Sequence, residues 1–230
     1  HRDLHYPLRR QRQMCIRDSY WGKEYSNQEI TDFLTENNIN YRYFDTDSLI
    51  DYTAENIKNK KVVGWFQGRF EWGPRSLGNR SILADPRDLQ MKDILNLKIK
   101  FREPFRPFAP SVLAEHAEEF FNIDDIDSKL PLKFMLYTVQ VKKPDLIPAA
   151  THIDNTARIQ IVHREDNALY YNLIESFRKK TGIPVLVNTS FNLKGKPIVN
   201  SPQDAYHTFK NSGIEILVMG NQVIEKQQRV

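Results

Sequence analysis

The sequence contains little cysteine and no long apolar run. One cysteine in 230 residues excludes an intramolecular disulfide framework and the paired cysteines of a structural zinc site. No apolar run approaches the ~18 residues that a membrane-spanning helix needs, and the mean hydropathy is −0.58. We therefore expect a soluble protein of a reducing compartment, with the cytoplasm as its location.

Several catalytic signatures are also missing. The sequence has no HExxH, no GxSxG and no P-loop lysine motif. However, 40% of the residues are hydrophobic and 11% are aromatic, which is enough for a packed core and argues against wholesale disorder. The candidate functional residues must therefore come from other constellations of side chains.

The positive charge is concentrated at the N-terminus. The net charge is +4, but residues 1–19 hold five arginines and two aspartates and account for +3 of it. This segment lacks the apolar stretch of a signal peptide and the pattern of a transit peptide, and residues 14–19 (MCIRDS) resemble a translated sequencing adapter. We expect residues 1–19 to be a non-native leader, with a genuine basic tail as the alternative.

Helical and extended patterns alternate from residue 20 onward. Ser26 and Glu29 form a capping-box pattern at the start of the first helix, and Leu89, Ile94 and Leu97 are expected on one side of another. We expect helices at residues 26–36, 49–58, 88–100, 111–121, 168–180 and 201–212, and strands at 61–66, 134–141, 157–162, 185–187, 214–219 and 222–226. This order favours an α/β (or α+β) domain with a twisted mixed sheet and flanking helices.

Residues 68–81 form the segment richest in candidate functional groups. Three glycines and a proline prevent a regular element, and Arg69, Arg75 and Arg80 recur without helical or strand periodicity. Arginine binds phosphate or carboxylate through a planar fork of donors, and glycine lets a ligand approach the backbone closely. The segment therefore indicates an anion-binding loop, with an ordinary surface loop of solvated arginines as the alternative.

A second basic cluster, residues 98–110, mixes cations with phenylalanines and prolines. Its cations include Lys100, Arg102 and Arg106. The cluster lies within residues 65–110, which carry a local net charge of +4. The favoured ligand is a polyanionic small molecule. The alternatives are a core of phenylalanines with outward-facing arginines, or a nucleic acid.

Two further segments place polar groups beside expected strands. His152 and Arg158 lie before or on a strand whose other face is apolar, and His152 could be an acid, a ligand or a structural histidine. Asn188, Ser190 and Asn192 follow the apolar run 185–187, at the end of a strand where open α/β sheets bind ligands. A simple polar turn is the alternative for this last segment.

Together these segments resemble the C-terminal domain of the carbamoyltransferases of the NodU and CmcH type, over about residues 20–226. The motifs occur in the family's order: VVGWFQGRFEWGPRSLGNRSILADPR, KFREPFRPFAPSVL, IPAATHIDNTARIQ, GIPVLVNTSFN and SPQDA. The resemblance implies a YrdC-like fold for residues 61–230 and makes residues 20–60 the tail of a preceding domain and its linker. One departure is Asn155, where the family pattern has glycine.

The resemblance implies that this domain binds ATP, with Mg²⁺, and carbamoyl phosphate, and that it forms carbamoyl adenylate with release of pyrophosphate. The two substrates together carry roughly six negative charges, so cations should outnumber bases in the site. By resemblance, the catalytic residues are Lys100, Arg106 and His152, and the substrate-binding residues are Arg75, Arg80, Arg102, Arg158, Asn188, Ser190 and Asn192.

The resemblance also implies a preceding actin-like ATPase-fold domain that holds iron or another divalent metal and transfers the carbamoyl group to a hydroxyl acceptor. We expect this missing domain to be a partner, and we expect no protein ligand for a metal within the present chain and no membrane partner. The rival interpretation is a YrdC-like RNA-binding module without catalysis. A third interpretation is a fragment without function.

Overall fold

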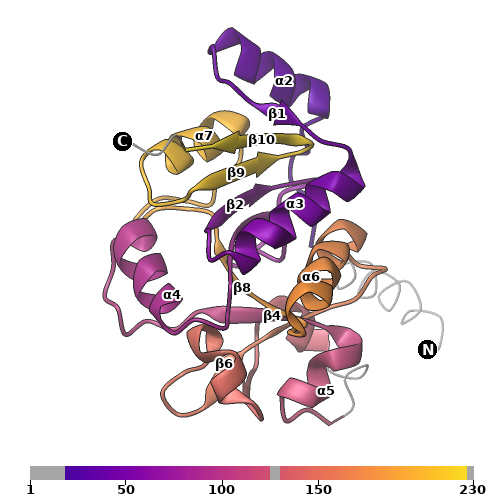
Figure 1. Ribbon diagram of the computed structural model, residues 1–230, viewed down its shortest axis with the longest axis vertical. Helices are drawn as coiled ribbons and strands as arrows, with labels where there is room; N and C mark the ends of the chain where they lie inside the picture. Colours follow the sequence, from indigo (N-terminus) through magenta and orange to yellow (C-terminus); the bar gives the residue numbers. More distant parts are fainter. Residues whose placement is uncertain (1–18, 125–129, 227–230) are drawn as a thin grey trace, which may run out of the picture.

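The computed structural model describes residues 19–124 and 130–226. An eight-stranded sheet in the order β1-β10-β9-β2-β3-β8-β4-β7 forms its centre, and a two-stranded sheet joins β5 to β6 (Figure 1). The strands are β1 (Arg42–Tyr43), β2 (Val63–Phe66), β3 (Arg80–Ala84), β4 (Ala109–Leu113), β5 (Thr138–Gln140), β6 (Thr156–Arg158), β7 (Gln160–Val162), β8 (Val185–Ser190), β9 (Ile216–Met219) and β10 (Gln222–Glu225). The predicted leader, apart from Ser19, lies outside the described residues.

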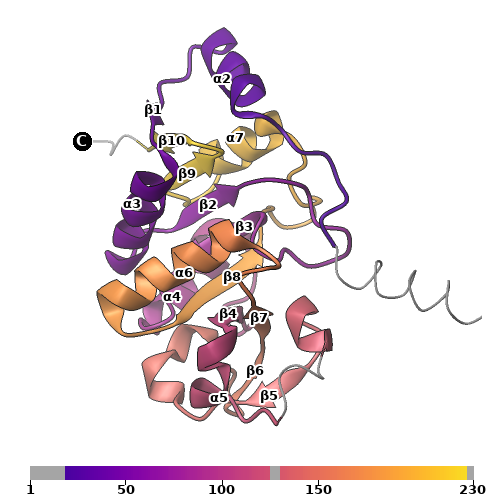
Figure 2. The same ribbon diagram turned by 90° about the vertical axis from the view of Figure 1, so that its right-hand side faces the viewer.

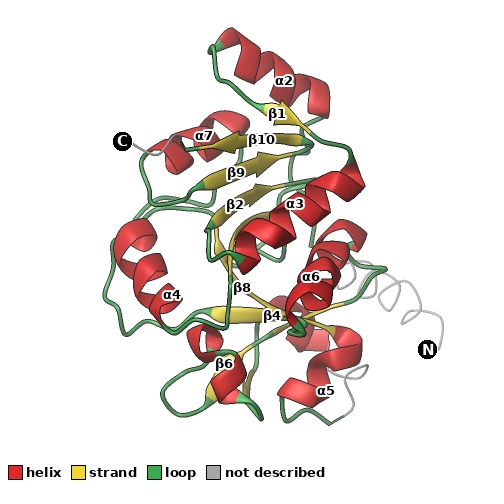
Figure 3. Ribbon diagram, viewed as in Figure 1, coloured by secondary structure: helices red, strands yellow, loops and turns green. Residues whose placement is uncertain are grey.

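The main sheet is mixed, as the sequence predicts. β2 pairs with β9 and β4 pairs with β7 in parallel, whereas the other neighbouring pairs of this sheet are antiparallel. The α-helices are α2 (Asn27–Glu36), α3 (Thr46–Lys58), α4 (Gln90–Asp93), α5 (Ala117–Phe120), α6 (Ala168–Thr181) and α7 (Pro202–Lys210) (Figure 3). The segment η1 (Ile94–Lys100) is a π-helix. The 3₁₀ helices are η2 (Ala114–His116), η4 (Leu130–Phe134), η5 (Pro144–Leu146) and η6 (Pro148–Ala150).

Helices cover both faces of the main sheet (Figure 2). Along β2, Trp65 packs in one apolar cluster with α3 and α6, and Phe66 packs in the other cluster with α2, η1 and α7. Successive strand residues point to opposite faces, so a strand covered on both sides must be apolar at every position. This explains why Val63–Phe66 is a continuous buried run.

Residues 20–60 pack as part of the same layers. β1 pairs with β10 at the edge of the sheet, and α3 packs against α6. The predicted capping box of Ser26 and Glu29 is present. α3 starts three residues earlier than the predicted position 49, because the Asp45 carboxylate accepts a hydrogen bond from the Ser48 amide at 3.0 Å. The proposed domain boundary at residue 60 stays a prediction.

The helix predicted over residues 88–100 has a different buried face. α4 continues into η1, a π-helix, and Leu89 and Leu97 are 63% and 53% exposed. A π-helix hydrogen-bonds each residue to the fifth one along, so a periodicity of 3.6 residues misassigns its faces. The wider turn brings Leu95 and Lys100 to the buried side together.

The helix predicted over residues 111–121 is confirmed only for residues 114–120. Residues Ala109–Leu113 form β4, which lies between β8 and β7 in the sheet, and only the short η2 and α5 follow. Pairing with two neighbouring strands overrides the local helical pattern. The strand predicted over residues 134–141 is reduced to β5, because η4 occupies its first residue.

β8 is longer than the predicted strand 185–187 and continues to Ser190. It pairs with β3 on one side and β4 on the other. Asn188 and Ser190 are therefore strand residues two positions apart, so both side chains belong to the same face of the sheet. This places two of the predicted site residues in the middle of the molecule instead of in a surface turn.

Candidate functional site

Lys100 is a buried cation that faces polar groups at the end of β8. Its side chain is 4% exposed, and its Nζ lies 2.7 Å from Asn192 Oδ1 and 3.1 Å from the Asn192 carbonyl oxygen. It also donates to the Ser190 carbonyl oxygen. No carboxylate of the described residues forms a salt bridge with it. Burial, together with the charge of Arg102, lowers the pKa of Lys100 to about 7.

Ser190 and Asn192 are held in place beside this lysine. The Ser190 hydroxyl donates to Asn192 Oδ1 at 2.8 Å, and Asn192 Nδ2 donates to the Lys196 carbonyl oxygen at 2.8 Å. The Asn192 amide is therefore oriented with its oxygen toward Lys100 before any ligand arrives.

Arg102 and Arg106 extend the positive charge outward from Lys100. Arg102 is half-buried, donates from Nε to Asn96 Oδ1 at 2.7 Å and lies over the Phe108 ring. Burial lowers the pKa of Arg102, and the charge of Arg106 lowers it further. Arg106 itself is exposed, and its Nε lies 2.9 Å from the Glu103 carboxylate.

Asn188 links β8 to the loop that carries Arg75. Its side chain is 1% exposed, and its Nδ2 lies 3.2 Å from the Ser76 carbonyl oxygen, 3.1 Å from Ser111 Oγ and 3.0 Å from Gln160 Oε1. Within the part of the chain that the structure describes, Asn188 Oδ1 and Ser76 Oγ are buried without a hydrogen-bond partner. Unpaired buried oxygens are uncommon and mark places where a water or ligand atom is expected.

Arg75 and Arg158 lie close enough to influence each other. Burial lowers the pKa of Arg158, and the positive charge of Arg75 lowers it further. Neither guanidinium forms a salt bridge with an acidic residue of the described ranges. Arg158 is half-buried, and its Nε has no hydrogen-bond partner among the same residues. Two like charges disfavour each other, so an anion bound between them would stabilise both.

His152 and Asp154 occupy the tight turn before β6. Burial lowers the pKa of His152, although the charge of Asp154 opposes this effect. The Asp154 carboxylate accepts from the Thr156 amide at 3.1 Å and the Thr156 hydroxyl at 2.7 Å. Asn155 has φ = 58°, a left-handed conformation that suits glycine and that asparagine tolerates. The departure at Asn155 therefore preserves the turn.

Arg80 lies inside the protein and is 0% exposed. Its guanidinium stacks on the Phe66 ring, with 3.7 Å to the ring centroid, and donates to the backbone carbonyl oxygens of Gln67 and Lys23. Burial lowers the pKa of Arg80 to about 10. The predicted role of Arg80 in phosphate binding stays a prediction, and this geometry favours a structural role.

The structure thus gathers the predicted residues in two groups that β8 connects. The first group surrounds Lys100, and the second surrounds the pair Arg75 and Arg158. The charge of Arg158 reaches His152, since it contributes to the lowered pKa of that histidine. Asn188 stands between the groups, because it contacts the loop of Arg75 and lies two residues before Ser190 on β8.

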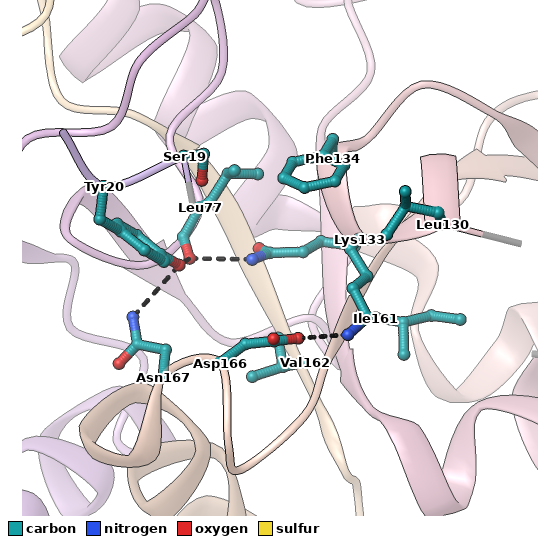
Figure 4. A pocket seen from close by; sticks show the side chains of 11 residues that line it. Ser19, Tyr20, Leu77, Leu130, Lys133, Phe134, Ile161, Val162, Asp166 and Asn167 are labelled. Carbon is teal, nitrogen blue, oxygen red and sulfur yellow. Dashed lines mark hydrogen bonds and ion pairs between the residues drawn. The ribbon is translucent and has the colours of Figure 1, made fainter. Parts of the chain in front are cut away.

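A small pocket lies between Leu77 and the side chains of Lys133 and Phe134 (Figure 4). Tyr20 donates its hydroxyl to the Leu77 carbonyl oxygen at 3.0 Å, and Gln160 Nε2 donates to the same oxygen at 2.8 Å. Across the pocket, Lys133 pairs with Asp166 at 2.6 Å. None of the described residues that line it is a predicted site residue. An adjoining open hollow is lined mainly by apolar side chains and includes Arg75.

Sequence reasoning missed Ser111 and Gln160. Both are buried, and the Ser111 hydroxyl donates to Gln160 Oε1 at 2.6 Å beside Asn188. The sequence does carry a signal for Gln160. It lies between the buried Ile159 and Ile161 in the predicted strand 157–162, and therefore on the polar face of that strand. Ser111 carried no such signal, since its segment has a helical pattern.

Within residues 19–124 and 130–226, no group of three or more His, Cys, Asp or Glu side chains is arranged to hold a metal ion. Over the same residues, we find no helix with the length and apolar character needed to cross a bilayer.

Two solved structures show which fold this is. Full-length HypF, determined in a phosphate- and nucleotide-bound form, is 17% identical, covers 76% of this chain and 25% of its own length, and superposes with a TM-score of 0.55. Sua5 of P. abyssi is 17% identical over 78% of this chain and 50% of its own length, with a TM-score of 0.52. Both have the YrdC-like fold, which confirms the predicted fold of this chain.

Curated relatives show the family. The nodulation protein NolO of Bradyrhizobium diazoefficiens is 42% identical over 228 residues, which cover 98% of this chain and 41% of NolO. The 3'-hydroxymethylcephem-O-carbamoyltransferase of Amycolatopsis lactamdurans is 38% identical over 161 residues, 70% of this chain and 30% of that enzyme. The present chain therefore spans about two fifths or less of the length of these relatives. The family model described as "Carbamoyltransferase C-terminus" matches residues 54–226, so the chain belongs to the carbamoyltransferase C-terminal family.

Proposed function

We propose that this chain is the adenylating part of an O-carbamoyltransferase. In this proposal it binds ATP and carbamoyl phosphate and forms carbamoyl adenylate, from which the carbamoyl group passes to a hydroxyl acceptor. The observation that carries the proposal is Lys100, a 4% exposed cation without a carboxylate partner among the described residues. A buried charge needs an opposite charge or a lowered pKa, and an anionic substrate supplies the missing partner.

The reaction requires neutralisation of negative charge more than it requires a strong base. Carbamate, released from carbamoyl phosphate by hydrolysis of its phosphate, attacks the α-phosphorus of ATP through an oxygen. A new P–O bond forms, the bond from the α-phosphorus to the bridging oxygen of the β-phosphate breaks, and pyrophosphate leaves with that electron pair. Fixed cations stabilise such a transition state because they are already oriented toward the developing charge.

The two groups of residues divide this work in the proposal. Lys100, with Arg102 and Arg106 outward from it, binds the phosphates at the end of β8. Arg75 and Arg158 bind a second set of anionic oxygens. Asn188 carries a buried oxygen without a partner among the described residues, and this oxygen is positioned to accept a hydrogen bond from the carbamoyl NH₂ group.

His152 and the amide of Asn192 have orienting roles in this scheme. Burial keeps the pKa of His152 below its ordinary value, so its ring is neutral at pH 7 and can donate or accept a hydrogen bond without adding charge. The polar groups of Ser190 and Asn192 already point toward Lys100. They hold the ammonium group where the α- and β-phosphates are proposed to lie.

Magnesium and the preceding domain complete the proposal. Among the described residues no cluster of acidic side chains is arranged for a metal ion, so we propose that Mg²⁺ arrives with ATP and keeps phosphate oxygens and water as its ligands. Mg²⁺ then supplies charge neutralisation on the leaving phosphates. We further propose that a preceding domain with its own divalent metal, such as iron, transfers the carbamoyl group to the acceptor, as the resemblance to the family implies.

The geometry disfavours the rival RNA-binding interpretation. A protein that binds the nucleic-acid backbone presents its cations along an accessible face. Here two of the predicted cations, Lys100 and Arg80, are 4% and 0% exposed. Such side chains cannot track an extended phosphate backbone.

Exchange of labelled pyrophosphate into ATP tests this proposal. The full chain with Mg²⁺, ATP and carbamoyl phosphate should catalyse the exchange without any acceptor, because adenylate formation is reversible. Replacing Lys100 by Met should reduce the exchange rate by at least ~100-fold. As a control, Lys179→Met on the exposed side of α6 should leave the rate unchanged.

Two results would contradict the proposal. One is no exchange from a folded, monomeric chain that binds ATP. The other is exchange that proceeds equally well without carbamoyl phosphate. Tight, steeply salt-dependent RNA binding by such an inactive chain would favour the RNA-binding module instead.

A further inference from the structure

The loop between β2 and β3 is organised around a buried acid, Glu71. Its side chain is 1% exposed. Its Oε1 accepts hydrogen bonds from the amides of Leu77 at 2.7 Å and Asn79 at 2.8 Å, and the Arg80 amide lies 3.1 Å from both carboxylate oxygens. A buried carboxylate is stable only when donors compensate its lost hydration. Three backbone amides from one short segment offset part of this cost, although burial still raises the pKa of Glu71 above its ordinary value.

Other contacts fix the same end of the loop. The Gly78 carbonyl oxygen accepts from Trp65 Nε1 at 2.9 Å, and the Gly78 amide donates to Ser81 Oγ at 3.1 Å. Gly78 has φ = 107°, and a Cβ at this position would lie 2.2 Å from the Tyr170 ring. The backbone at residues 77–80 therefore has little freedom to adopt another conformation.

This arrangement determines how the loop can meet an anion. A glycine-rich loop often offers its backbone amides to a phosphate. In this loop the amides of Leu77, Asn79 and Arg80 point inward to Glu71. The carboxylate of Glu71 therefore takes the hydrogen bonds that these amides could otherwise donate to a bound phosphate. The side chain of Arg75 is a charged donor of this loop that forms no salt bridge with a described acidic residue and can still meet a ligand.

Arg75 lies in the five-residue span between Glu71 and Leu77. The carboxylate of Glu71 accepts from the Leu77 amide across that span, and the side-chain amide of Asn188 holds its last residue through the Ser76 carbonyl oxygen. The position of Arg75 relative to Arg158 therefore depends on the Glu71 contacts, although Glu71 itself lies inside the protein and away from solvent.

We propose that Glu71 is a positioning residue, whose buried carboxylate gathers the amides of Leu77, Asn79 and Arg80 and thereby holds Arg75 beside Arg158. This inference rests on the proposed function for the role of Arg75 in anion binding. The claim about the loop itself does not depend on that function.

Amide hydrogen exchange tests the claim about the loop. In the parent chain, the amides of Leu77, Asn79 and Arg80 should exchange at least ~10-fold more slowly than exposed loop amides. Replacing Glu71 by Gln keeps the shape of the side chain and removes its charge. It should speed these three amides by about 10-fold or more and leave the amides of β9 unchanged. Glu36→Gln, at the exposed end of α2, is the matched control.

Two outcomes of this experiment overturn the proposal. The first is fast exchange of these three amides in the parent chain, which is measurable even when the variant does not fold. The second is unchanged protection of these amides in a folded Glu71→Gln chain.

A double-mutant cycle on ATP affinity tests the link to Arg75. Arg75→Ala and Glu71→Gln should each weaken ATP binding by on the order of 10-fold, and the double variant should be no weaker than Arg75→Ala alone. A merely structural role for Glu71 predicts effects that multiply, which would overturn the positioning role. If the parent chain binds no ATP, the proposed function fails, but hydrogen exchange still decides whether Glu71 fixes the loop.

Discussion

The Nζ of Lys100 lies 2.7 Å from Oδ1 of Asn192, and both groups sit at the end of β8. The lysine reaches this place because η1 is a π-helix, whose wider turn brings residue 100 to the buried side with Leu95. The ammonium group is thus held by neutral oxygens and lacks a carboxylate within the described residues. Its protonation is therefore sensitive to any anion that binds beside it.

Binding of ATP should be accompanied by proton uptake at Lys100. Burial lowers the pKa of Lys100 to about 7, so at pH 8 the free chain carries mostly neutral lysine. A bound phosphate favours the charged form and raises this pKa again. Calorimetry in buffers of different ionisation enthalpy should show uptake of roughly one proton per ATP at pH 8, and Lys100→Met should abolish it. Equal proton uptake by both chains would contradict this prediction.

The same lowered pKa predicts a pH dependence of stability. Between pH ~7 and the ordinary lysine value of 10.5, the unfolded chain binds a proton that the folded chain does not. The contribution of Lys100 to the free energy of unfolding should therefore rise with pH across this window. Denaturation of the parent and of Lys100→Met at pH 7 and pH 9 measures the difference. A slope shared by both chains would show that Lys100 is not its source.

Arg75 and Arg106 should differ in their effect on ATP binding. Arg75→Ala removes a guanidinium that has no salt bridge to a described acidic residue, and ATP affinity should fall by on the order of 10- to 100-fold. Arg106 is exposed and pairs with Glu103 at 2.9 Å, so Arg106→Ala should weaken binding by only a few-fold. Titration calorimetry decides between them, with Arg42→Ala at the far edge of the sheet as the control. A larger effect at Arg106 would reverse the assignment.

The elements that the sequence predicts correctly are those in which the local residue pattern favours the same structure as the packing in the fold. The helix at α2 follows its capping box, and the apolar strands β2 and β9 match their predicted segments, because a strand buried on both faces must be apolar throughout. The anion-binding role of the cationic segments around Arg75 and Lys100 stays a prediction.

The misassigned segments have tertiary causes. Ser111 belongs to β4 because β7 and β8 flank it, a pairing that no local window contains. Leu97 is exposed because of the π-helix. The role of Glu71 depends on three amides up to nine residues away, and the burial of Arg80 depends on the Phe66 ring and the Lys23 carbonyl oxygen. None of these contacts has a signal in composition or spacing.

Arg80 should be essential for stability. Its guanidinium satisfies the buried carbonyl oxygens of Gln67 and Lys23, so Arg80→Met should reduce the free energy of unfolding by roughly 3 kcal/mol. The folded variant should bind ATP within about two-fold of the parent, because this side chain is 0% exposed. Urea denaturation and titration calorimetry measure the two effects. Unchanged stability with lost ATP binding would return Arg80 to the phosphate-binding group.

Gly78 and Gly73 offer a matched test of how tightly the loop between β2 and β3, which carries Arg75, is packed. Both have positive φ, 107° and 119°, so alanine at either position introduces similar backbone strain. At Gly78 the new Cβ would also lie 2.2 Å from the Tyr170 ring, whereas at Gly73 nothing lies within 4 Å. Gly78→Ala should therefore cost about 2 kcal/mol more than Gly73→Ala in urea denaturation. Equal costs would show that the packing against Tyr170 is loose.

Direct detection of the adenylate tests the central claim most directly. The chain is mixed with Mg²⁺, ATP and carbamoyl phosphate labelled with ¹³C at the carbonyl carbon, and the bound species is observed by ¹³C and ³¹P magnetic resonance. We predict a ¹³C signal coupled to the α-phosphorus of the adenylate, formed together with pyrophosphate and absent from Lys100→Met. Binding of both substrates to the parent chain with no such coupled signal and no pyrophosphate would contradict the assignment of this domain as the adenylating part of the enzyme.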